Sequence, residues 1–306
     1  MSIRFACFDY FCGHICCLKN TPLTHRLFSS TLQAYAGDAI VAIVAGQFAG
    51  AAAGARGPTG PFELSTVFLA LGGILATILW KENVAVSDPG TEGKPSIRDA
   101  INVVKADRKI MLVGATQSLF EAAMYIFVLQ WPPAITKAIQ NVFGASAATP
   151  YGTVFSCFMA CCLMGSTLFG QFAKMGVRTE TFTAGMLALA TLAMGGSTLA
   201  ASSATMSLWT LVAGFFAFEG CVGMYFPSIG TLRSKYVPDS HRSVIMNLFG
   251  IPLNALVVSV FLSSKFLGLT GSLGISTGAL GIATMCMIAL QRTTGKAAVE
   301  TVAVAA

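Results

Sequence analysis

The chain has 306 residues, of which 55% are apolar and only 10% are charged, and its mean hydropathy is +0.71. A soluble globular domain carries roughly 25% charged residues. The composition therefore excludes an ordinary soluble domain, and it also excludes collagen-like, disordered and coiled-coil chains.

Apolar runs of membrane-spanning length recur along the chain, and the charged residues collect between them. A helix needs about 20 apolar residues to cross the hydrocarbon core, and the sequence lacks the alternating strands of about ten residues that a β-barrel would show. We therefore predict an all-α membrane protein with about eight transmembrane helices. In chain order the predicted spans are 38–56, 62–80, 110–131, 151–173, 181–202, 207–228, 243–264 and 270–290.

Turn-forming residues separate most of these spans. Gly57-Pro58 and Gly60-Pro61 are predicted to close the first hairpin. Pro132-Pro133 is predicted to follow the third span.

The distribution of basic residues predicts the orientation. Sixteen of the 19 Lys and Arg residues fall on one side of this topology, and only Arg56, Lys137 and Lys265 fall on the other. Cytoplasmic loops carry the excess of basic residues, so both termini and the 81–109 loop are predicted to be cytoplasmic. The formal charge of +6 is thereby explained without a nucleic-acid partner.

The polar loop at 81–109 divides the predicted spans into two before it and six after it. Six spans beside a long basic loop are typical of one half of a major facilitator carrier, which has two six-helix halves around a midplane site. The predicted divisions are an amino-terminal segment 1–27, a two-helix remnant 28–80, the interdomain loop 81–109, a six-helix half 110–291 and a tail 292–306.

Residues 1–27 fit none of these helices. The apolar stretch within them is short and contains Asp9 and His14. We keep two interpretations of the segment, which are a truncated or alternative start of the gene product and an interfacial helix.

Three stretches have specific patterns. Residues 114–133 read GATQSLFEAAMYIFVLQWPP, residues 219–238 read EGCVGMYFPSIGTLRSKYVP, and residues 242–254 read RSVIMNLFGIPLN. Together they resemble the seventh, tenth and eleventh helices of the molybdate-anion transporter family of the major facilitator superfamily. Residues 41–46 and 80–83 look like its fifth and sixth helices, so that the resemblance covers about residues 31 to 290.

The resemblance implies uptake of molybdate or a similar oxyanion by alternating access, in a chain that lacks the first four helices of the family. It also implies a multi-pass protein, expected in the plasma membrane, whose partners are the substrate oxyanion and the lipid bilayer. Coupling to a proton is a separate expectation, which comes from the intramembrane acids described next. No cofactor is expected. Two positions depart from the family pattern, since Gly250 stands where the family has Arg and Asp38 where we expect Asn.

Glu121 and Glu219 lie near the middle of their predicted spans, where a charged carboxylate is costly and marks a transport pathway by default. Gln117 precedes Glu121 by four residues, so both lie on one helix face. The alternative is that each acid is neutral and holds helices together by a hydrogen bond. Because two carboxylates would repel an oxyanion and no predicted span has Lys or Arg in its middle, we expect one acid to carry a proton, since burial favours the neutral form.

Asn247, Gly250 and Asn254 share one face of the eleventh-helix segment, and Pro252 favours a kink there. An exposed carbonyl and two amides would be a plausible oxyanion contact, although a kink stabilised by the two amides is an equal alternative. The candidate substrate and coupling pathway is Gln117, Glu121, Tyr125, Glu219, Tyr225, Asn247 and Asn254.

Four basic residues are candidates for gating, because pairing them with acids or helix ends would lock one conformation. They are Lys174, Arg178, Arg233 and Arg242. Topology alone is the alternative explanation.

Asp38 is predicted to cap the amino terminus of the first span, and Gly46, Gly50 and Gly54 are predicted to allow close helix packing.

The cysteines give no metal signature, because no CxxC or HExxH motif occurs and Cys157, Cys161 and Cys162 fall inside a span. We predict no metal site. An integral membrane enzyme would need clustered nucleophile or His and Asp signatures, so we expect no enzyme. The alternatives that remain are a transport-inactive truncated paralogue or fragment, and a carrier of another small solute.

Overall fold

The structure is a computed structural model that describes residues 22–80, 96–203 and 207–305. Within these ranges the chain is helical apart from short turns and contains no strand. The elements are α2 (Pro22–Arg56), η1 (Gly57–Thr59), α3 (Gly60–Leu79), α4 (Ile97–Ala106), α5 (Arg108–Phe143), α6 (Tyr151–Lys174), α7 (Thr179–Ser202), α8 (Leu208–Tyr236), η2 (Asp239–His241), α9 (Arg242–Leu262) and α10 (Ser264–Ala305).

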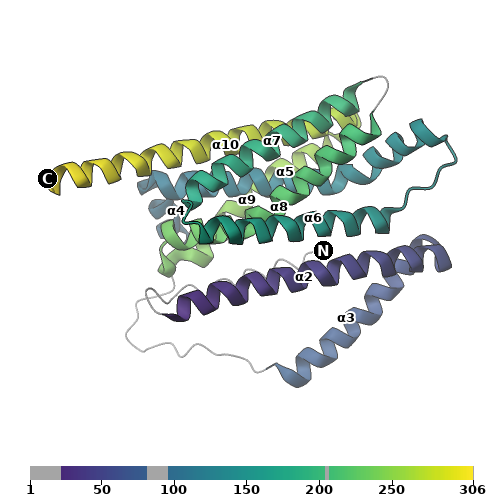
Figure 1. The fold of residues 1–306 in the computed structure, drawn as a ribbon, viewed down its shortest axis with the longest axis horizontal. Helices are drawn as coiled ribbons and strands as arrows, with labels where there is room; N and C mark the ends of the chain where they lie inside the picture. The colour runs from purple at the N-terminus through teal and green to yellow at the C-terminus, as the bar shows by residue number, and fades with distance from the viewer. Residues whose placement is uncertain (1–21, 81–95, 204–206, 306) are drawn as a thin grey trace.

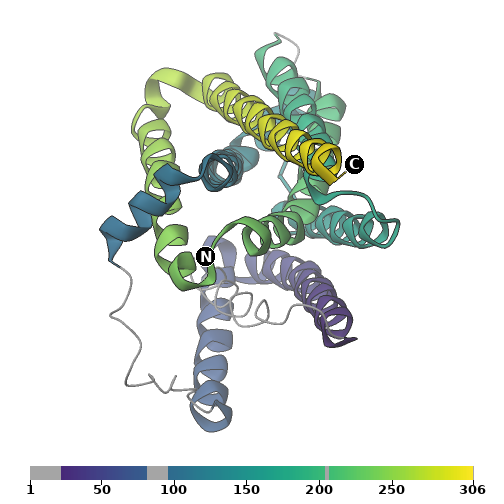
Figure 2. The same cartoon turned by 90° about the vertical axis from the view of Figure 1, so that its left-hand side faces the viewer.

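Six long helices, α5 to α10, lie side by side in one bundle, and α2 packs on its α6 side (Figure 1). Helix α10 lies against α5 and α7, α8 lies against α6 and α7, and α9 lies along α5. Figure 2 looks along this bundle and shows α3 projecting away from it. The prediction of an all-α fold with several membrane-spanning helices is confirmed.

Seven segments of the described chain are long and apolar enough to cross a membrane. They are Gly37–Leu79, Arg108–Phe143, Tyr151–Lys174, Thr179–Ser202, Leu208–Tyr236, Asp239–Leu262 and Ser264–Thr294. The first of them contains both the first and the second predicted span, because only the short turn η1 separates α2 from α3.

The turn between α2 and α3 lies at Gly57-Pro58, as predicted. Gly57 has a φ of 74°, a left-handed conformation that glycine adopts without strain. The predicted cap at Asp38 is wrong, since α2 begins at Pro22 and Asp38 lies exposed inside the helix. Residues before 38 continue the helix, and no proline interrupts them after its first position.

Helix α5 continues to Phe143, so the prediction that Pro132-Pro133 ends the third span is wrong. Proline removes two backbone donors here, but packing beyond it compensates. Ala134, Ile135 and Ala138 are fully buried. The Thr136 hydroxyl donates to the Pro132 carbonyl at 2.9 Å. Tertiary packing thus overrides the local signal.

Helix α10 is interrupted at Gly268, where φ is 60° and ψ is −169°. The helical run of the predicted eighth span, 270–290, follows this kink and continues beyond residue 290. The glycine therefore turns the chain between α9 and the long part of α10.

Part of the predicted loop 81–109 forms the short helix α4. Ser96 and Asp99 form a capping box at its start, with the Ser96 hydroxyl accepting from the backbone N–H of Arg98 at 3.3 Å. Its buried residue Ala100 packs in a cluster with Ile110, Val237 and Ile245. This cluster fixes α4 against the start of α5 and the connection between α8 and α9.

Glycines allow close contact between α2 and α6. A methyl group at Gly46 would overlap the carbonyl of Gly152, and one at Gly152 would overlap that of Gly46, so the two helices meet backbone to backbone. The Ser156 hydroxyl of α6 also donates to the Ile43 carbonyl at 2.8 Å. The predicted packing role of Gly46 and Gly50 is confirmed, whereas Gly54 has no neighbour within 4 Å among the described residues.

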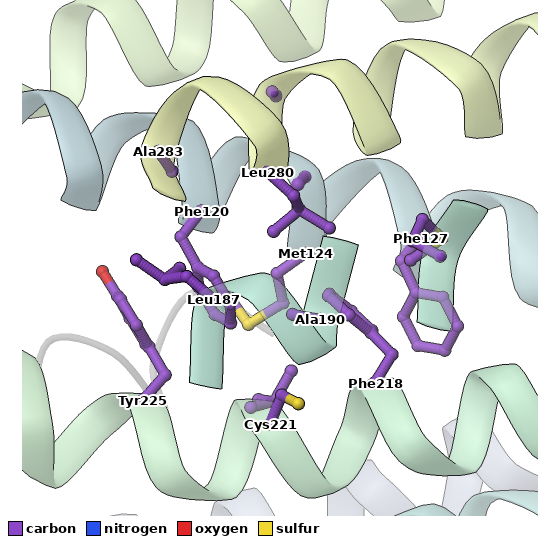
Figure 3. Packing of buried hydrophobic residues seen from close by; sticks show 14 of the residues in the cluster. Phe120, Met124, Phe127, Leu187, Ala190, Phe218, Cys221, Tyr225, Leu280 and Ala283 are labelled. Atoms are coloured by element: carbon purple, nitrogen blue, oxygen red, sulfur yellow. The ribbon is translucent and has the colours of Figure 1, made fainter. Parts of the chain in front are cut away.

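The core lies between α5, α7, α8 and α10 (Figure 3). Its centre is aromatic, and the ring of Phe127 contacts those of Phe158, Phe215 and Phe218 at centroid distances of 5.6, 5.0 and 5.1 Å. In a bilayer, such van der Waals packing drives helix association because lipid is as apolar as the side chains. This core holds α5 against α8, where the candidate site lies.

Candidate functional site

Four polar side chains from α5 and α8 form one hydrogen-bonded cluster. Gln117 and Glu121 come from α5, and Tyr225 and Arg233 come from α8. Each pair is placed by helical spacing, since residues four or eight apart lie on one face. We call Gln117, Glu121, Tyr225 and Arg233 the α5–α8 cluster.

Arg233 is at the centre of this cluster. Its Nε donates to Gln117 Oε1 at 2.9 Å, and its Nη2 donates to Glu121 Oε1 at 3.1 Å. The side chains of Arg233 and Glu121 each retain only 15% of their accessible surface. Because water is largely excluded, the pair is electrostatically stronger than a surface pair, and removing one partner would leave a poorly solvated charge.

Tyr225 supplies a second donor to the same oxygen. Its hydroxyl donates to Glu121 Oε1 at 3.0 Å. The residue is fully buried, and its ring stacks on that of Phe120 at a centroid distance of 3.9 Å (Figure 3). The aromatic core therefore holds the hydroxyl in place, and Glu121 Oε1 accepts from both a neutral donor and a cationic one.

The prediction that Arg233 lies in a loop between spans is wrong, because Arg233 belongs to the last turn of α8. The expectation that no span has Lys or Arg in its middle stays compatible with this position, since the guanidinium meets Glu121 from the end of its helix. Helix α8 runs on to Tyr236, eight residues beyond the predicted end. Leu232 is fully buried, and the Thr231 hydroxyl donates to the Pro227 carbonyl at 2.9 Å. The fall in hydropathy after residue 228 thus does not end the helix, and Arg233 reaches from it to α5.

Glu219 lies apart from the α5–α8 cluster. It is 14 residues before Arg233 on α8, which corresponds to about 21 Å along the helix axis. Its exposed fraction is 6%, and no hydrogen bond or ion pair between described residues involves its carboxylate. Cys161 of α6 is close enough to interact with it electrostatically. The two predicted intramembrane acids therefore occupy different environments.

Tyr125 lies one turn beyond Glu121 on α5 and is partly exposed. The spacing places it on the same side of the helix as Glu121. It is the remaining predicted pathway residue on this helix.

Asn247 and Asn254 lie outside the cluster, on the exposed side of α9. Asn254 Nδ2 donates to the Gly250 carbonyl of its own helix at 2.8 Å, and α9 runs unbroken through Pro252. The opposite side of α9 faces α5, where the Ser118 hydroxyl donates to the Phe249 carbonyl at 2.7 Å. The structure thus does not unite the two amides with the acids of α5 and α8.

The other predicted gating residues are also separate from the cluster. Lys174 is exposed at the end of α6. Arg178 Nη2 lies 3.5 Å from Thr294 Oγ1 of α10. Arg242 pairs with Asp239 and donates to the Val237 carbonyl at 3.2 Å. Arg178 therefore links two helices, whereas Arg242 stabilises the turn before α9.

Sequence analysis missed Glu180, in the first turn of α7. It is 1% exposed and accepts from Lys235 Nζ at 2.5 Å and from the Tyr236 hydroxyl at 2.6 Å. An acid in a first helical turn is an ordinary helix-dipole feature, so its position along the chain offers no reason to pair it with α8. The contact ties the end of α8, two residues after Arg233, to α7.

In the part of the chain that the structure describes, no group of three or more His, Cys, Asp or Glu side chains could hold a metal ion. Cys157, Cys161 and Cys162 all lie on α6. Cys12, Cys16 and Cys17 lie outside the described residues.

A known family matches most of the chain, from its amino-terminal part into α8. Residues 3–224 match the family described as sugar transporters, 12 TM, of the major facilitator superfamily. The chain belongs to this family. It is a family of transporters, which is not an enzyme class.

Curated relatives in this family carry the name molybdate-anion transporter. The chain is 30% identical to that of Xenopus tropicalis over 71% of its own length and 46% of the relative. It is 27% identical to that of Xenopus laevis over 83% of its own length and 55% of the relative. It is 32% identical to that of Danio rerio over 52% of its own length and 31% of the relative. The chain thus spans about half the length, or less, of these major facilitator relatives.

Proposed function

We propose that this major facilitator chain takes part in transport of a small oxyanion such as molybdate, along a path that passes the α5–α8 cluster. The single observation that carries the proposal is the partly buried Arg233 guanidinium, which donates to both Gln117 and Glu121. The names of its relatives support the choice of molybdate.

The chemistry of Arg233 suits an oxyanion. A planar guanidinium presents several donors that match the oxygens of a tetrahedral anion, and such charge-assisted bonds are strong. In the present arrangement Glu121 supplies the negative partner. We propose that an arriving oxyanion replaces Glu121 at Arg233, with the Gln117 amide and the Tyr225 hydroxyl as further donors. Arg233 offsets the charge of Glu121 in the present arrangement, so the cluster presents no unpaired carboxylate to an approaching oxyanion.

We further propose that Glu219 carries the coupled proton. A buried carboxylate without a partner is costly in a bilayer, and a proton neutralises it. Its electrostatic neighbour is the Cys161 thiol, and the paired Glu121 and Arg233 lie further along the same bundle. Glu121 and Glu219 would then have separate roles, one as a counter-ion and one as a proton carrier.

Alternating access requires the packed six-helix bundle to move relative to α2 and α3. The contact between α2 and α6, with the Gln47 amide donating to Ser156 Oγ at 3.0 Å, is a proposed surface for this motion.

From the distribution of basic residues, we propose that both termini are cytoplasmic, and we propose the plasma membrane as the location of the chain.

The test is uptake of radiolabelled molybdate into vesicles that contain the purified full chain, compared with empty vesicles. We expect saturable uptake that unlabelled molybdate inhibits and glucose does not. Accumulation no greater than in empty vesicles would show that the chain alone is transport-inactive and would overturn the proposal. Uptake of glucose in place of molybdate would show a sugar carrier instead.

Replacing Glu219 with glutamine is expected to remove the pH dependence of uptake. If a proton travels with the anion, uptake by the unaltered chain rises as the external pH falls, because protonation of Glu219 precedes transport. The amide cannot take up this proton, so the variant should transport at a rate that is independent of pH. The measurement is the initial rate of molybdate uptake across a series of external pH values.

The matched control is Glu63→Gln on α3, which removes an exposed carboxylate paired with Arg56. This control should keep the pH dependence of the unaltered chain. A Glu219→Gln variant with unaltered pH dependence would exclude Glu219 as the proton carrier, while leaving the oxyanion proposal at Arg233 in place.

A further inference from the structure

Helix α4 has two different faces. Ala100 is fully buried, and Val103 and Val104 pack against the cluster that includes Ile110 and Val237. The opposite face carries Arg98 and Lys105, which are seven residues apart and therefore lie on one side of the helix. The apolar face of α4 is thus covered by the bundle, and its basic face remains exposed.

The orientation of α4 is that of an interfacial helix. Figure 2 looks along the bundle, and there α4 extends sideways from the start of α5. It joins α5 directly at Asp107, where that membrane-spanning segment begins. A short amphipathic helix placed across the end of a span lies at the level of the lipid headgroups.

The positive charge of this region is not neutralised by its own acids. Asp99 Oδ2 accepts from the backbone N–H of Ser96 at 3.3 Å, and Asp107 Oδ1 accepts from that of Lys109 at 2.8 Å, so both acids serve as helix caps. No ion pair between described residues involves the basic residues Arg98, Lys105, Arg108 and Lys109. Arg98, Lys105 and Arg108 are exposed.

We propose that Arg98, Lys105, Arg108 and Lys109 form a binding surface for anionic phospholipid headgroups of the membrane leaflet on the α4 side. Four basic residues beside the start of a span are the pattern that attracts acidic lipids. Ile97, which is 67% exposed, adds an apolar side chain next to Arg98 that can enter the acyl boundary. The surface is separate from the α5–α8 cluster, so this inference does not depend on the transported solute.

The test compares lipids retained by the purified full chain from mixed micelles of detergent, phosphatidylserine and phosphatidylcholine. The test variant is Arg98→Gln with Lys105→Gln. A basic residue near an acidic surface contributes about fivefold in binding, so the double variant should lose about thirtyfold in phosphatidylserine affinity at low salt. The loss should shrink as salt is raised, because salt screens exposed charges.

The matched control is Lys137→Gln with Lys265→Gln, which removes two exposed basic residues, one in the second half of α5 and one in the first turn of α10. This control should retain as much phosphatidylserine as the unaltered chain. The double variant Arg98→Lys with Lys105→Arg should do the same, because it preserves both positive charges. Thermal unfolding of all variants checks that the exposed substitutions leave the bundle intact. The proposal would be overturned if the test variant retained as much phosphatidylserine as the unaltered chain. It would also be overturned if the Lys137 and Lys265 control lost as much as the test variant.

Discussion

Replacement of Arg233 with glutamine is expected to lower molybdate uptake by about tenfold to a hundredfold, since a hydrogen bond to a charged group contributes roughly 1.5–3 kcal/mol. The same change leaves Glu121 largely buried without its cation. Breaking a buried pair in this way costs about 3–5 kcal/mol, so the variant should also unfold at a lower temperature. Initial uptake rates in vesicles and thermal unfolding in detergent measure the two effects.

Two further variants separate substrate binding from stability. The double variant Arg233→Gln with Glu121→Gln removes both charges, so it should recover most of the stability but none of the uptake. Lys137→Gln removes an exposed cation in the second half of α5 and should leave both quantities unchanged. Recovery of uptake in the double variant would show that the ion pair is only structural, and it would contradict the proposed contact between Arg233 and the oxyanion.

Replacement of Gly165 with alanine is expected to cause a large loss of stability for so small a substitution. The new methyl group would overlap the backbone carbonyl of Gly220, where α6 meets α8. A backbone atom cannot rotate away, so the helices must separate. Overpacking of this kind costs about 1–3 kcal/mol, occasionally more, and thermal unfolding in detergent would measure it. Gly223→Ala should act in the same way, because its methyl group would overlap the Cys162 carbonyl.

Gly185→Ala provides the control for this prediction. Gly185 is an exposed helical glycine on α7, and a methyl group there would have no neighbour within 4 Å among the described residues. Alanine favours a helix over glycine by roughly 0.5–1 kcal/mol, so stability should be kept or slightly raised. Similar losses at Gly165 and Gly185 would show that the contact between α6 and α8 is looser than the structure indicates.

The motif residues illustrate how much of the candidate site is predictable from the sequence. Helical spacing alone places Gln117 and Glu121 on one face of α5. It cannot bring Arg233 to them, because the two motifs are more than 100 residues apart along the chain. Helical spacing also cannot show that Asn247 and Asn254 lie away from the acids. Only the packing of α9 on α5 decides which face of α9 is exposed.

Helix ends are predicted well where hydropathy and turn residues agree, and poorly where packing extends a helix. The turn at Gly57-Pro58 is predicted correctly because glycine there adopts a left-handed conformation. The predicted ends of α5 and α8 are wrong, because buried contacts at Ile135 and Leu232 continue each helix past the signal that should end it.

By itself the sequence determined that the chain is a multi-pass helical membrane protein, because bilayer thickness and the cost of charge in lipid act on composition alone. Only the tertiary structure decided that Arg233 neutralises Glu121 while Glu219 stays apart. Charge pairing depends on distances of a few ångströms between helices, and those distances are set by aromatic packing and by glycine contacts that no local pattern specifies.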